Sequence, residues 1–198
     1  MRRHGRRVEG VCAAGMEIFS FLLMTFLFGS GSFLTMERDE AAGRKNPSLG
    51  CILPKACPMT GYESWFRVGS RCVKYFGSRL NFTAAEFSCR SKAPGGHLVS
   101  MHNTKANGDV LCIVIKYSPH NLRIWIGAFE FFQSGRFVWT DGSSWNYQIW
   151  TPGEPNHRFS NREDCVEMNW NHVGKWNDDA CYVQKNYVCA FKVMTALT

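Results

Sequence analysis

The sequence lacks a long uninterrupted hydrophobic run. Its most apolar stretch, residues 18–28, holds about 11 residues, whereas a membrane-spanning helix needs roughly 20. Arginines precede this stretch and small residues follow it at 29–32, which is the order of a secretory signal peptide. We therefore expect residues 1–35 to be a cleaved signal peptide, and the mature protein to be secreted without a membrane anchor. The alternative is a signal anchor that keeps its arginines in the cytosol.

A basic stripe is also missing. The net charge of +7 includes the N-terminal arginines, and the other lysines and arginines are scattered among acidic and aromatic residues. Such a scattered excess is typical of a solvated surface, so we expect no binding to nucleic acid.

The sequence shows no Ser/His/Asp or Cys/His set that indicates nucleophilic catalysis. Adjacent acids such as Glu163 and Asp164 point to opposite faces of a strand, which is not the geometry of a paired-carboxylate glycosidase. We therefore expect a binding protein and not an enzyme.

Paired CxxC motifs are absent, although cysteine is abundant. Eight of the nine cysteines lie after residue 50, at irregular spacings. This pattern argues against a zinc ribbon and against an ordinary cytosolic protein. A disulfide-bonded domain in an oxidising compartment agrees with the predicted signal peptide.

The rest of the chain divides into a linker and one domain. Residues 36–56 are polar and contain several Gly and Pro residues, which indicates a linker. The domain is predicted to span residues 57–192, with a short tail at 193–198. This length is sufficient for a single hydrophobic core.

Local patterns predict a hairpin and two helices in the first half of the domain. Residues 67–76 place aromatic and branched side chains around a Gly-Ser turn, which indicates two paired strands. Residues 81–89 are predicted to be helical, with Thr83 as N-cap and Glu86 as its capping-box partner. Apolar residues at helical spacing predict a second helix over 103–117.

The second half of the domain is predicted to contain short strands and a long loop. From residue 124, aromatic and β-branched runs alternate with clusters of Gly, Asn, Asp and Pro. Residues 141–164 have many turn formers and few strand signals. A loop of this length inside a compact domain is usually functional.

Oxygen-bearing side chains gather in this loop and shortly after it. Calcium takes six to eight oxygen ligands, whereas zinc prefers His and Cys. If the bond before Pro155 is cis, the side chains on both sides of the proline face one point. Taken alone, however, Glu-Pro-Asn is more often a plain proline turn. The oxygen-bearing residues are Glu154, Asn156, Glu163, Asp164, Asn177, Asp178 and Asp179.

Several short motifs occur together in the domain. They are Trp125-Ile126-Gly127-Ala128, Glu154-Pro155-Asn156, Glu163-Asp164-Cys165 and Trp176-Asn177-Asp178. With these motifs and the surrounding cysteines, residues 57–192 resemble the long form of the C-type lectin domain. Within that family, the chain is similar to small secreted fish lectins and type II antifreeze proteins. The resemblance implies an α+β, C-type lectin-like fold, in which two helices flank two small antiparallel sheets and disulfides hold a long loop region.

The resemblance also implies disulfide pairs. These are Cys57 with Cys72, Cys89 with Cys189, and Cys165 with Cys181. Cys51 and Cys112 remain, and they either pair with each other or link two chains. We prefer a link between chains for at least one of them, which predicts a disulfide-linked homo-oligomer.

The resemblance implies one calcium site with a sugar bound to it. The ligands carried over are Glu154, Asn156, Glu163, Asn177 and Asp178, and the same five residues are expected to contact the sugar. Glu-Pro-Asn is the mannose-type form of the motif, so the expected partners are glycans with mannose-type sugars, on self or microbial surfaces. The alternatives are ice binding, as in type II antifreeze proteins, or binding of a protein ligand.

A second calcium site of some C-type lectins is expected to be absent or weak here. Ser134 and His157 stand where carboxylates are expected, which leaves Glu130 and Asp164. Separately, residues 81–83 form an Asn-Phe-Thr sequon, so Asn81 is a candidate for glycosylation.

Overall fold

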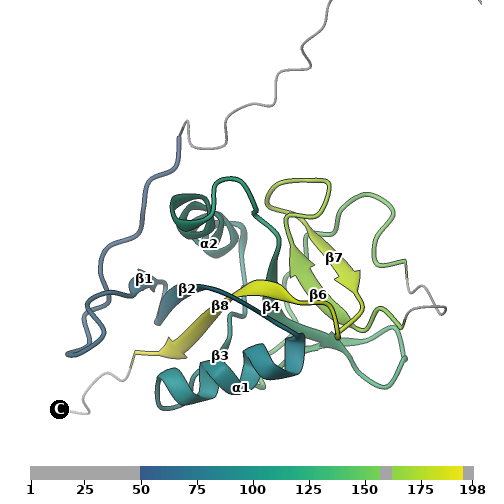
Figure 1. Ribbon diagram of the computed structural model, residues 1–198, viewed down its shortest axis with the longest axis horizontal. Coiled ribbons are helices and arrows are strands. Elements are labelled where there is room, and N and C mark those ends of the chain that lie inside the picture. The colour runs from purple at the N-terminus through teal and green to yellow at the C-terminus, as the bar shows by residue number, and fades with distance from the viewer. Residues whose placement is uncertain (1–49, 157–161, 194–198) are drawn as a thin grey trace, which may run out of the picture. The chain divides into compact units, whose positions relative to one another are not determined.

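The computed structural model describes residues 50–156 and 162–193 (Figure 1). In these ranges the chain forms two helices, α1 (Phe82–Lys92) and α2 (Thr104–Tyr117), and eight strands that belong to one sheet. The strands are β1 (Phe66–Val68), β2 (Arg71–Leu80), β3 (His97–Leu98), β4 (Ile124–Glu130), β5 (Phe137–Trp139), β6 (Cys165–Met168), β7 (Trp176–Asp179) and β8 (Lys185–Lys192).

The sheet is mixed, and its main order is β1-β2-β8-β4-β6-β7. Strand β3 also pairs with β8, and β5 pairs with β4. The α+β fold class is confirmed, but the two expected antiparallel sheets are joined into one. The joint is the parallel pairing of β4 with β8, in which Ile124 lies opposite Asn186 and Trp125 opposite Tyr187.

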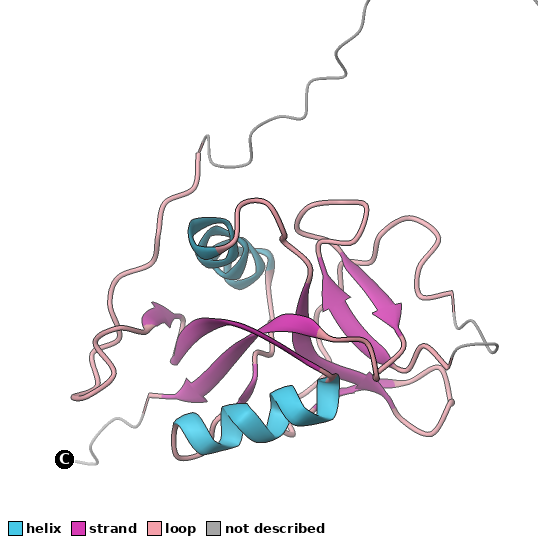
Figure 2. Cartoon of the chain, in the orientation of Figure 1, coloured by secondary structure: helices cyan, strands magenta, loops and turns pink. Residues whose placement is uncertain are grey.

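Strand β8 separates two hydrophobic cores because its side chains alternate between the faces of the sheet. Val188 and Ala190 belong to the core on the α2 side, which includes Val110 of that helix. Tyr187 and Cys189 belong to the core on the α1 side. Figure 2 shows the two helices on either side of the central strands. Each helix therefore covers one face of the same strand.

Helix α1 begins after Asn81. The Oδ1 atom of Asn81 accepts a hydrogen bond from the backbone N–H of Ala84 at 2.8 Å. Thr83 lies inside the helix, so the prediction that Thr83 is the N-cap is wrong. Both residue types cap helices well, but Asn81 has the extended backbone that a cap requires, with φ −67° and ψ 163°.

Glu86 connects α1 to β3 and does not act as a capping-box partner. Its Oε2 accepts a hydrogen bond from the backbone N–H of Leu98 at 2.9 Å, while Oε1 lies 2.7 Å from His97 Nδ1 and 2.8 Å from Arg90 Nε. Burial opposes ionisation of this carboxyl, but the bonds from Leu98, Arg90 and His97 outweigh that effect and lower the pKa of Glu86. The carboxylate thus fixes the helix to the sheet.

Four disulfides staple the domain. Three of them are the pairs implied by the resemblance, and they close the β1–β2 region, join α1 to β8, and join the start of β6 to the segment after β7. They are Cys57–Cys72, Cys89–Cys189 and Cys165–Cys181.

The fourth disulfide joins Cys51 to Cys112 within the chain, with their Cα atoms 5.3 Å apart. The preference for a link between two chains through one of these cysteines is therefore wrong. The physical reason is the path of residues 51–56, which belong to the predicted linker. Lys55 O accepts a hydrogen bond from Arg67 N at 2.7 Å, so this segment follows β1 and brings Cys51 to α2.

None of the helices in the described ranges is long and apolar enough to cross a membrane. The predicted signal peptide, residues 1–35, lies outside the described residues, and so does the predicted tail, residues 193–198, apart from Val193.

Candidate functional site

The segment that carries Glu154 is held beside β7 by backbone hydrogen bonds. Trp176 N donates to Ile149 O at 2.9 Å, and Thr151 N donates to Trp176 O at 2.8 Å. Glu154 N then donates to Thr151 O at 2.9 Å, which closes a turn. The turn places the Glu-Pro-Asn motif opposite the residues that follow Trp176.

Trp176 is the packing centre beneath this segment. It is fully buried, and its Nε1 donates to Asn107 Oδ1 of α2 at 2.9 Å. Aromatic rings from the loop and from β5 surround it, with centroids 5.6 to 6.1 Å away. A buried aromatic of this size contributes about 3–5 kcal/mol to stability, so the base of the loop is firmly held. The surrounding rings belong to Trp139, Trp145, Tyr147 and Trp150.

The Glu154–Pro155 bond is cis. The backbone N–H of Asn156 donates a hydrogen bond to Asp178 Oδ1 at 3.1 Å. This contact joins the two motifs directly. Asp178 is 1% exposed, so its carboxylate lies under the loop and not on the open surface.

Glu154 lies in a crowded anionic environment. Burial raises the pKa of its carboxyl from 4.5 to about 7, and the neighbouring Asp178 and Glu163 carboxylates act in the same direction, against a smaller opposing effect of Asn156. Glu154 Oε2 is buried and has no hydrogen-bond partner among the described residues. Crowded carboxylates with an unsatisfied oxygen are the arrangement that a divalent cation relieves.

Glu163 and Asp178 approach this place from neighbouring strands. Glu163 comes two residues before β6, and β6 pairs with β7 so that Val166 lies opposite Asp178. The disulfide Cys165–Cys181 fixes the same corner. Residues 157–161, between the two halves of the site, lie outside the described residues, and so does His157.

Asn177 is 5% exposed and donates from Nδ2 to Glu167 Oε1 at 3.0 Å. The structure therefore brings Glu154, Asn156 and Asp178 together, with Glu163 near enough to influence Glu154, and places Asn177 next to them on β7. Over the described ranges, no three His, Cys, Asp or Glu side chains are grouped as a metal site.

Glu130 is one of the two acids that remain at the position of the family's second calcium site. Here its side chain bonds to the backbone of a turn. Its Oε1 accepts a hydrogen bond from Gly135 N at 2.6 Å. The other, Asp164, lies 3.7 Å from Arg162 Nη2.

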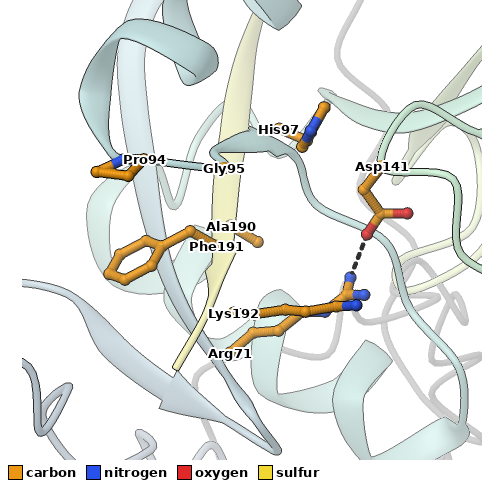
Figure 3. Close-up of a pocket in the computed structure, with 8 residues that line it drawn as sticks. All are labelled: Arg71, Pro94, Gly95, His97, Asp141, Ala190, Phe191 and Lys192. Carbon is orange, nitrogen blue, oxygen red and sulfur yellow. Dashed lines mark ion pairs between the residues drawn. The ribbon is translucent and has the colours of Figure 1, made fainter. Parts of the chain in front are cut away.

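A cavity of about 420 Å³ lies elsewhere, between the start of β2, the turn after α1 and the end of β8 (Figure 3). Arg71 and Asp141 form an ion pair of 2.6 Å at one side of it. Burial opposes ionisation of Asp141, but bonds from Ser100 and Ser143 and the charge of Arg71 lower its pKa. None of the five residues assigned to calcium and sugar lines this cavity.

Residues 78–191 match the family described as Lectin C-type domain, and the chain shows its disulfides and its two helices around a mixed sheet. The chain belongs to the C-type lectin family. A C-type lectin is a binding protein, which confirms the expectation that the chain is not an enzyme.

Two relatives illustrate the range of the family. A C-type lectin mannose-binding isoform from Oxyuranus scutellatus is 34% identical over 171 residues, covering 85% of this chain and 96% of the relative. The galactose-specific lectin nattectin from Thalassophryne nattereri is 33% identical over 135 residues, covering 68% of this chain and 80% of the relative. The two names differ in the sugar, so similarity alone does not choose between them.

A solved structure supports the fold. The C-type lectin CEL-I from Cucumaria echinata superposes with a TM-score of 0.61 at 27% identity, covering 68% of this chain and 96% of that chain.

One cluster behind the site was missed from the sequence. Four charged residues form ion pairs there, with Glu167 and Lys185 buried and Arg123 and Asp179 partly exposed. These residues come from three strands and one loop. The only signal in the sequence is that Glu167 and Asp179 lie close to the motifs.

Proposed function

We propose that this C-type lectin is secreted and binds mannose-type sugars through one calcium ion. The proposed ligands of the ion are Glu154, Asn156, Glu163, Asn177 and Asp178. The observation that carries the proposal is the convergence of Glu154 and Asp178, whose carboxylates crowd together and leave a buried oxygen of Glu154 without a partner in the described part of the chain. A divalent cation supplies the charge that this arrangement needs.

When bound, calcium supplies a Lewis-acid centre to which two neighbouring sugar hydroxyls coordinate. The side chains of the site complete the recognition. Carboxylates such as Glu154 and Glu163 accept hydrogen bonds from the hydroxyls, while amides such as Asn156 and Asn177 donate them. Asp178 remains buried and binds the backbone of the loop, so its role is to hold the ion and the loop together.

The order of acceptor and donor supports mannose-type specificity. Glu154 places an acceptor before the proline, and Asn156 places a donor after it. Exchanging the two chemistries with E154Q/N156D reverses this polarity while keeping the size of both side chains. We expect the double variant to lose mannose binding and to gain galactose binding, whereas no change in preference would refute this assignment.

The function is tested on a glycan array with the secreted protein, in calcium and again in excess chelator. A sugar that replaces two waters gains little net free energy, and a single site is expected to bind near 1 mM, so the glycans must be displayed densely. We expect mannose-type binding that chelator abolishes. D178N should abolish it too, while D109N, which removes an acid on α2 that pairs with Lys105, should not.

Three results would overturn the proposal. Binding that persists unchanged in chelator would exclude the calcium mechanism. Thermal hysteresis without glycan binding would instead identify an ice-binding protein. Binding to a protein ligand alone would identify the remaining alternative of this family.

A further inference from the structure

A buried carboxylate lies directly behind the Asn177 ligand. Glu167 is fully buried on β6. Its Oε2 accepts from Arg123 Nε at 2.8 Å and lies 3.3 Å from Lys185 Nζ, and its Oε1 accepts from Arg123 Nη2 at 2.5 Å. Asp179 contacts the same two cations, at 3.0 Å from Arg123 and 2.5 Å from Lys185. Two acids thus face two bases, and the cluster is balanced in charge.

Glu167 makes one further contact that the charge balance does not require. Its Oε1 accepts a hydrogen bond from Asn177 Nδ2 at 3.0 Å. The two residues face each other across the pairing of β6 with β7. An ionised carboxylate only accepts hydrogen bonds, and an amide can present either its nitrogen or its oxygen. Glu167 therefore selects the orientation of Asn177 in which Nδ2 faces the cluster and Oδ1 faces away from it.

We propose that Glu167 is a positioning residue that holds the Asn177 amide with its oxygen available to calcium. The inference rests on the proposed calcium site and deepens it. Metal ligands are commonly oriented by such hydrogen-bonded partners, and loss of the partner lowers metal affinity about 10- to 100-fold. The second hydrogen of Asn177 Nδ2 remains available to a sugar hydroxyl.

The variant E167Q tests this role because it reverses the orienting contact. The four groups around Glu167 are all donors, and three belong to Arg123 and Lys185, which cannot become acceptors. If the glutamine oxygen takes the place of Oε2, the glutamine nitrogen takes the place of Oε1 and faces Arg123 Nη2 and Asn177 Nδ2. Of these two donors, only Asn177 can present an acceptor instead, by rotating its amide. That rotation points Oδ1 at residue 167 and Nδ2 toward the ion.

The matched control is D179N. It removes a carboxylate from the same two cations, but among the described side chains Asn177 donates to Glu167 and not to Asp179. Both variants are measured by calcium titration calorimetry and by thermal melting in chelator. We expect both to lower the melting temperature of the calcium-free protein, and only E167Q to weaken calcium binding by about 10-fold or more.

The double variant N177D/E167Q provides a rescue. N177D alone places two carboxylates against each other in a buried site and should destabilise the calcium-free protein. With glutamine at 167, the new carboxylate accepts from the glutamine nitrogen and keeps oxygens for the ion. We expect the double variant to recover both the melting temperature lost in N177D and the calcium affinity lost in E167Q.

The possible failures are distinguishable. If the unaltered protein binds no calcium, the proposed function fails. If the unaltered protein binds calcium and E167Q binds it equally well, or if D179N weakens calcium binding as much as E167Q does, Glu167 has only a structural role and the positioning inference is overturned.

Discussion

Removing the Cys51–Cys112 disulfide should destabilise the domain by a predictable amount. The bond closes a loop across 61 residues, and the Cys57–Cys72 bond shortens the connecting path by about a quarter. The chain-entropy relation for such a loop gives about 4 kcal/mol of stabilisation through the unfolded state. We expect C51A/C112A to lose up to this amount, which corresponds to a fall in Tm of roughly 8–16 °C for a domain of this size.

The measurement is urea unfolding followed by tryptophan fluorescence, without reductant and at fixed calcium. The matched control is I52A, because Ile52 is 85% exposed and neighbours Cys51 in the chain. A surface substitution of this kind changes stability by at most about 0.5 kcal/mol. A difference between the two variants then reports the cross-link and not the packing of the segment.

Two results would refute the reasoning. One is a double variant that unfolds at the same urea concentration as its parent. The other is a non-reducing peptide map of the parent protein in which Cys51 or Cys112 is joined to the same cysteine of a second chain.

Other expected outcomes concern pH, calcium and glycosylation. The free energy of unfolding should fall below about pH 4, because the folded-state pKa values of Glu86 and Asp141 are lowered. The stabilisation from these two carboxylates is complete above their unfolded-state pKa values, and it is lost as the pH falls through their folded-state pKa values. Thermal melts of E86Q and D141N should depend less on acid, and unchanged profiles would contradict this. Chelator should lower Tm, since calcium at 100 times its Kd contributes about 2.7 kcal/mol; a Tm indifferent to calcium would argue against the site. Asn81 is exposed, and only its side-chain oxygen caps α1, so its side-chain nitrogen can carry a glycan. Protein secreted by eukaryotic cells should therefore lose mass on N-glycosidase treatment. The variant T83A should abolish that loss without removing the cap.

Local signals predicted both helices, but the end of α1 and its cap less well: α1 continues to Lys92, three residues beyond the predicted end. Helix α2 runs from Thr104 to Tyr117 with Asn103 as its cap, so its ends agree with the prediction to within one residue. For α1, Asn81 and Thr83 are both good caps by residue type, and the choice depends on a distant contact. Phe82 N donates to Cys181 O at 3.0 Å, which fixes the chain at the entry of the helix. Sequence patterns do not record such a contact.

Long-range pairing explains the other differences. The parallel contact between β4 and β8 joins residues about 60 positions apart, and neither strand alone indicates which partner it takes. The disulfide partner of Cys51 could not be predicted from the sequence either, because the distance from Cys51 to Cys112 depends on how residues 51–56 follow β1. The calcium ligands were easier to propose, since their motifs are short and contiguous in sequence.

Glu167 shows why the support of a site is harder to predict than its ligands. Its neighbours in sequence are Val166 and Met168, and its functional neighbours are Arg123, Lys185 and Asn177 from other segments. The cluster has a physical consequence for the site. Because Arg123 and Lys185 already balance Glu167 and Asp179, the charge of Glu167 does not have to be offset by calcium. Only the carboxylates of the proposed cage remain for the ion, so β6 can bury one acid, Glu167, that orients a ligand, while other acids are left for binding.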